Sequence, residues 1–99
     1  MLSNATLQSL TIRPADEHDS RSLAALAQLD SARPLEGDVL VAERENAPLA
    51  AIDVLSGRLV ADPFRRTAND ADLLRARAAQ LRGRRQRRRL GRLIGLAAA

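Results

Sequence analysis

Four short segments of this chain, one of alternating apolar and polar residues and three with continuous apolar runs, are typical of β-strands, in which successive side chains lie on opposite faces. The four predicted strands cover residues 6–13, 38–43, 49–55 and 58–62. In the second of them, Val39 and Val41 share one face, while Leu40 and Ala42 share the other. The last three strands are joined by short polar turns, so we expect them to form an antiparallel meander.

Two further segments carry apolar residues at helical spacing. The first begins at Asp16, whose carboxylate can accept from the free amides of a first helical turn, and it ends before Pro34. The second runs from Asp70 to Arg82, with acids near its start and arginines near its end, and Gly83 is a natural stop. The predicted order of strand, helix, three strands and helix describes an α+β fold, a small antiparallel sheet of about four strands with two helices.

The chain changes character after Gly83. The last nineteen residues contain seven arginines and no acid, whereas the first eighty contain nine arginines and twelve acids. Like charges at this density repel one another and favour disorder. We therefore predict one domain at residues 1–83 and a disordered, arginine-rich tail at residues 84–99.

The arginines of this tail can bind the phosphate backbone of a nucleic acid by releasing counterions. The candidate residues are Arg84, Arg85, Arg87, Arg88 and Arg89. No aromatic residue is interleaved with them, so base stacking adds no affinity. Two alternatives stay open: a solvated tail that only keeps the protein soluble, or a basic helix that contacts an anionic membrane surface or a partner protein.

The composition excludes several kinds of site. The chain has no cysteine and a single histidine, so it forms no disulfide or thiolate metal site, and we predict no metal site of any other kind. No segment approaches the roughly 18 apolar residues of a membrane span, and the N-terminal residues lack the features of a signal peptide. We therefore expect a cytoplasmic protein.

Candidates for a general base are few. His18 lies in the first turn of the first predicted helix, where a surface or capping role fits better than catalysis. Asp53 lies inside a predicted strand, and we interpret it as solvated or paired with Arg58 across the next turn rather than as a tuned carboxylate. Glu43 and Glu45 flank a turn and are interpreted as solvated. No residue is therefore assigned a catalytic role.

The sequence Leu-Thr-Ile-Arg-Pro-Ala at residues 10–15 is followed by an acid-capped helix. This arrangement resembles the start of a GNAT-type N-acetyltransferase. The hairpin of residues 39–52 resembles its second and third strands, and residues 59–63 resemble its fourth strand and the loop before the cofactor helix. The resemblance covers roughly residues 10–82, the N-terminal half of the family's fold. It implies acetyl-CoA as a cofactor, with Arg65, Arg66 and Thr67 in the phosphate-binding loop.

The same loop departs from the family's pattern. Members carry glycines there, because a side chain would obstruct the close approach of backbone amides to the pyrophosphate. Residues 65–72 read Arg-Arg-Thr-Ala-Asn-Asp-Ala-Asp, without a glycine, and Asp70 and Asp72 occupy the place of the phosphates. The tyrosine that often serves the family as a general acid has no counterpart, because the chain has no tyrosine. The family's later strands, which shape the acyl cleft, are not expected in this chain either.

These departures predict a non-catalytic, GNAT-like domain that acts through association with protein. One alternative is an acyl-CoA-dependent N-acetyltransferase whose site is completed by a second subunit, and another is non-specific nucleic-acid binding through the tail. In this scheme the sheet edge nearest residues 59–61 has no cover from the chain itself, and an open edge presents unpaired backbone groups. We expect a second copy or another protein to bind at this edge.

Overall fold

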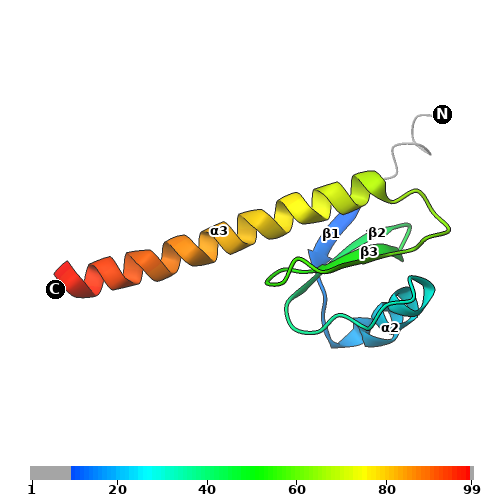
Figure 1. Cartoon of the computed structure of the whole chain (residues 1–99), viewed down its shortest axis with the longest axis horizontal. Helices are drawn as coiled ribbons and strands as arrows, with labels where there is room; N and C mark the ends of the chain where they lie inside the picture. Colours follow the sequence, from blue (N-terminus) through cyan, green and yellow to red (C-terminus); the bar gives the residue numbers. More distant parts are fainter. Residues whose placement is uncertain (1–9, 99) are drawn as a thin grey trace.

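A computed structural model describes residues 10–98, with side chains as far as Arg92 (Figure 1). Its centre is one antiparallel sheet with the strands in chain order, β1-β2-β3-β4. The strands are β1 (Thr11–Pro14), β2 (Val39–Arg44), β3 (Ala47–Asp53) and β4 (Leu59–Ala61). A 3-10 turn, η1 (Glu17–Asp19), leads into helix α2 (Ser20–Leu29), and helix α3 (Ala68–Ala98) follows the sheet. The predicted α+β class and the predicted order of elements are confirmed. Residues 6–9 of the predicted first strand lie outside the described residues.

The two helices cover opposite faces of the sheet, as Figure 1 shows with α3 on one side and α2 on the other. Val39 and Val41 of β2 pack toward α2, while Leu40 and Ala42 pack toward α3. The first four residues of the strand are all apolar and all buried, so this part of β2 is buried on both faces. The core on the α2 side contains Leu23, Leu26, Ala27, Leu35, Val39, Val41, Ala51 and Val60. The core on the α3 side contains Leu40, Ala42, Ala50, Ile52, Val54, Leu74 and Ala78.

A two-residue turn joins β2 to β3. Glu45 and Asn46 both have positive φ, 55° and 63°, which together with the pairing of Arg44 with Ala47 makes a type I′ hairpin. The sequence predicted a longer turn through Pro48, but β3 already begins at Ala47. A register shift next to the turn lets the strand accept a proline without losing its pairing.

Replacing Glu45 and Asn46 by Asn and Gly is expected to raise the free energy of unfolding by about 1 kcal/mol, because Asn-Gly adopts the left-handed pair of conformations at least cost. Urea denaturation followed by circular dichroism measures this gain. Gly57→Ala is the opposite control, since Gly57 has φ of 77° and an alanine there is strained. A double variant no more stable than the natural chain would contradict the I′ turn.

Helix α3 continues through Gly83 to Ala98, so the predicted helix end at Gly83 is wrong, and residues 84–98 are helical where the composition predicted disorder. A glycine inside a helix costs only about 1 kcal/mol relative to alanine, and arginine is a good helix former. Long-range contacts also hold the helix on both sides of Gly83. Arg82 donates to the carbonyl of Val54 at 2.6 Å, and Arg85 pairs with the carboxylate of Asp38.

The part of α3 beyond the sheet projects from the domain as a straight rod (Figure 1). Between residues 10 and 98, no helix contains a run of apolar residues long enough to cross a membrane.

Candidate functional site

The loop between β4 and α3 holds the residues that the sequence assigned to a cofactor. Arg65 and Arg66 are exposed, and Thr67 is half-buried directly before the first residue of α3. The carbonyl of Thr67 accepts from the amide of Ala71 at 2.8 Å, so Thr67 closes the first turn of the helix. The structure thus brings the three predicted residues to the N-terminus of α3, with Thr67 already engaged through its backbone.

The first turn of α3 carries its own carboxylate. Asp70 is only 3% exposed, and its Oδ1 accepts from Nη2 of Arg44, at the end of β2, at 3.3 Å. A carboxylate near the positive end of a helix dipole is stabilised there, as a phosphate would be. Asp72 instead faces solvent and pairs with Arg75 at 3.4 Å. Of the two acids that the sequence placed in the phosphate position, the structure buries Asp70 alone.

An open hollow of about 460 Å³ lies beside this turn. It is lined by Arg44, Arg66, Thr67, Ala68, Asn69 and Asp70. An anion that entered the hollow would meet the guanidinium of Arg66, but it would compete with Asp70 for that of Arg44. Like charges at this range repel, so the carboxylate lowers the affinity of the hollow for a phosphate.

The isolated titratable residues lie where a structural role explains them. His18 is exposed, with Nε2 3.8 Å from the carboxylate of Glu17. Asp53 accepts through Oδ1 from the amides of Leu55 at 3.0 Å and Ser56 at 3.4 Å, which makes it the first residue of an Asx turn.

The predicted pairing of Asp53 with Arg58 is not among the ion pairs of the described residues. Arg58 instead donates to the carbonyls of Arg33 at 2.9 Å and Pro34 at 2.8 Å. The guanidinium therefore ties the loop after α2 to the strand β4, and Asp53 is left to shape its own turn.

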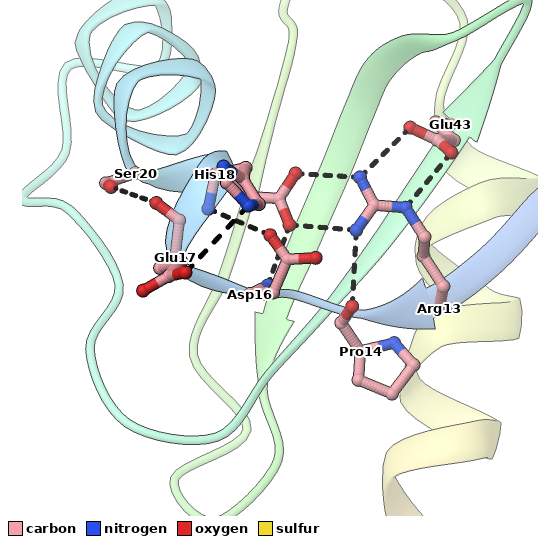
Figure 2. Close-up of polar contacts among 8 residues, drawn as sticks. Arg13, Pro14, Asp16, Glu17, His18, Ser20 and Glu43 are labelled. Atoms are coloured by element: carbon pink, nitrogen blue, oxygen red, sulfur yellow. Dashed lines mark hydrogen bonds and ion pairs between the residues drawn. The ribbon is translucent and has the colours of Figure 1, made fainter.

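Sequence reasoning missed an ionic cluster centred on Arg13 of β1, shown in Figure 2. Its guanidinium donates two hydrogen bonds to the carboxylate of Asp19, at 2.8 and 2.7 Å, and its Nε donates to Glu43 of β2 at 3.1 Å. Asp19 is 8% exposed, and the parallel pair of bonds is the strongest geometry for an arginine and a carboxylate. The cluster therefore ties β1, η1 and β2 together.

A local capping box completes this cluster. The amide of Asp16 donates to Asp19 Oδ2 at 2.8 Å, and the amide of His18 donates to Asp16 Oδ1 at 2.8 Å. The hydrogen bonds from Arg13, followed by the one from the backbone of Asp16, hold the pKa of the Asp19 carboxyl well below its ordinary value. The same contacts, with Asp19 first and Glu43 second, raise the pKa of the Arg13 guanidinium. Arg13 is paired with both Asp19 and Glu43, so we assign the cluster a structural role.

The edge of the sheet at β4 is the second predicted site of interest. Among the described strands, β4 is the last in the sheet, as predicted, and it pairs with β3 alone. The prediction that this edge has no cover from the chain itself is wrong in part, because the amide of Ala61 donates to Asp30 Oδ2 at the end of α2, at 3.0 Å. Three residues beyond β4 lies Phe64, the only aromatic residue of the chain, and it is 81% exposed. Its ring is the most exposed large apolar side chain of the described residues.

The arginines predicted to bind nucleic acid lie on one continuous helix. Arg84, Arg87, Arg88 and Arg89 are exposed on α3 beyond the sheet, and Arg85 is the one that pairs with Asp38. Of the alternatives that the sequence left open for this segment, the structure shows the basic helix.

Among the side chains that the structure describes, no three histidine, cysteine, aspartate or glutamate residues lie close enough together to hold a metal ion. Comparison of the chain with protein-family models, with curated proteins and with solved structures found no match in any of the three.

Proposed function

We propose that this chain is a GNAT-like domain that transfers no acetyl group and acts through association with a protein surface, in the first place a second copy of itself. The observation that carries the proposal is the buried Asp70 in the first turn of α3, paired with Arg44. A diphosphate needs the amides and positive charge of such a turn, and here the carboxylate of Asp70 already lies in the turn and is paired with Arg44. The order of the elements supports the likeness to the family, and the occupied turn supports the loss of its chemistry.

The surface that we assign to association is the corner made by the outer edge of β4 and Phe64. The backbone amide of Asp53 donates to the carbonyl of Arg58, and the backbone amide of Asp62 donates to the carbonyl of Leu49, so alternate residues of 58–62 point their backbone groups toward β3. Leu59 and Ala61 then present their backbone groups outward, since alternate residues of a strand face opposite sides. Asp30 engages one of these groups, and Phe64 offers an apolar anchor beside the rest.

We expect the natural chain to self-associate at concentrations of about 100 μM, as for a small interface of modest affinity. Phe64→Ser is expected to abolish this self-association. Size-exclusion chromatography with light scattering measures the mass across this range. Leu73→Ser is the matched control, because Leu73 is also exposed, at 52%, but lies on α3. A natural chain that stays monomeric, or a dimer that persists in Phe64→Ser, would contradict the assignment of this surface.

Calorimetry with acetyl-CoA tests the other half of the proposal. We expect no saturable binding up to about 1 mM, which corresponds to less than about 4 kcal/mol of binding free energy. A dissociation constant in the micromolar range would show that the turn holds a phosphate in spite of Asp70. That result would favour the alternative of an acetyltransferase completed by a second subunit.

A further inference from the structure

Helix α3 has two parts with different surroundings. Its first part packs Ala71, Leu74 and Ala78 against the sheet. Its second part passes the end of the sheet and carries exposed arginines from residue 84 to residue 92 (Figure 1). No acidic residue follows Asp72 in the sequence, so this part of the helix has only positive side-chain charge.

The arginines gather on one side of this rod. Successive residues of a helix turn by about 100°, so five of the arginines fall within an arc of about 140°. We call them the arginine face: Arg84, Arg85, Arg88, Arg89 and Arg92. With a rise of about 1.5 Å per residue, the face is about 12 Å long. The arginine face therefore has two rows along the helix, and successive arginines within a row are four residues apart.

The arginine face has little negative charge near it. Among the ion pairs of the described side chains, Arg85 with Asp38 is the only one that involves the face. Within the face, arginines four residues apart repel each other and weaken the helix by a few tenths of a kcal/mol per pair. A ligand with regularly spaced negative charges would remove this cost.

We propose that the arginine face binds the phosphate backbone of double-stranded nucleic acid without preference for base sequence. A helix about 10–12 Å wide fits the major groove, which is about 12 Å wide and bordered by phosphates of both strands. Guanidinium groups bind phosphate oxygens through paired hydrogen bonds. This inference goes beyond the association proposed for β4, because it concerns another element and another class of partner.

Other ligands fit the described side chains less well. Single-stranded nucleic acid is bound largely by stacking on aromatic rings, and α3 contains none. A membrane-surface helix needs a broad apolar face opposite its charges. On that side of the described part lie Gly83, Gln86 and Arg87, and Leu90 is the one large apolar side chain. The sequence adds Leu93 and Ile94 further along, so lipid vesicles form one arm of the test.

Fluorescence anisotropy of a labelled duplex of about 20 base pairs, titrated with the full chain at two salt concentrations, tests the proposal. Four or five phosphate contacts give a slope of about −4 in log K against log salt, so the affinity should fall about 250-fold between roughly 50 and 200 mM NaCl. Arg84→Gln, Arg88→Gln and Arg92→Gln together remove one row, and the slope should fall to about −1. Two duplexes of unrelated sequence should bind within a factor of about three, since phosphate contacts carry no sequence information.

The control removes the same charge elsewhere: Arg21→Gln, Arg75→Gln and Arg77→Gln together, all exposed and outside the arginine face. This variant should keep the slope of about −4. Circular dichroism of both triple variants shows whether α3 is retained.

Equal slopes for the two triple variants would overturn the proposal, as would the absence of duplex binding at the lower salt concentration. Binding to vesicles of phosphatidylserine without binding to duplex would also overturn it, in favour of a lipid surface. None of these results would alter the mass measured for the natural chain or for Phe64→Ser, so the two proposals fail separately.

Discussion

Asp19→Asn is expected to lower the free energy of unfolding by about 2 kcal/mol at pH 7. The change leaves the guanidinium of Arg13 beside an uncharged amide in a site where Asp19 is 8% exposed. Removing one partner of a fully buried ion pair costs about 3–5 kcal/mol. Arg13 keeps a third of its side chain in contact with water, which screens part of that loss.

The same substitution should change how stability depends on pH. The pKa of the Asp19 carboxyl is lower in the folded chain than its ordinary value of 3.8. Its contribution is therefore complete above about pH 4 and is lost as the pH falls through the folded-state pKa. We expect the natural chain to lose stability below pH 4 more steeply than Asp19→Asn does.

Urea denaturation at a series of pH values measures both effects. Glu17→Gln is the control, because Glu17 is an acid of the same turn whose side chain is almost fully exposed. It should cost less than about 0.5 kcal/mol and leave the pH dependence unchanged. Curves for the natural chain and Asp19→Asn that coincide at every pH would mean that the ionic cluster contributes nothing to the fold.

Leu74→Ala is expected to lower the free energy of unfolding by about 3 kcal/mol. Leu74 is 0% exposed and packs between α3 and the sheet, so the substitution loses buried apolar surface and leaves a cavity. Since small domains are stable by only about 5–15 kcal/mol, this loss is a large share of the total.

Leu73→Ala provides the control for this experiment, with the same chemical change one residue earlier in the same helix. Leu73 is 52% exposed, so its truncation should cost less than about 1 kcal/mol. Thermal or urea denaturation of both variants measures the difference. Equal losses would mean that α3 does not pack on the sheet through Leu74.

The sequence predicted best what depends on neighbouring positions. The period of two correctly placed Val39 and Val41 on one face of a strand and Leu40 and Ala42 on the other, and the structure buries both faces. The stripe of Leu74 and Ala78 identified the part of α3 that packs on the sheet. Short turns between strands then limited the order of the sheet to a meander.

Contacts between distant residues explain what the sequence could not predict. Arg13 lies 30 positions from Glu43, and Asp70 lies 26 positions from Arg44, so neither pair follows from local spacing. The capping box that includes Asp19 is local, and its pattern of two acids three residues apart was the one signal available for that cluster.

The length of α3 was misjudged for the same reason. Gly83 is a common helix stop when only neighbouring residues are considered. Arg82 and Arg85 reach carbonyl and carboxylate groups 28 and 47 positions away, which hold the backbone helical across the glycine.

Asp70 was predictable only in part. The sequence placed this acid correctly in the first turn of α3, but its burial follows from the fold.

The rigid path of α3 separates the two surfaces by a fixed spacing. Arg88 lies twenty residues after the first residue of the helix, which amounts to about 30 Å along its axis. Phe64 lies just before the other end of that helix. A protein bound at Phe64 and a duplex bound at Arg88 would therefore contact places about 30 Å apart along one continuous helix.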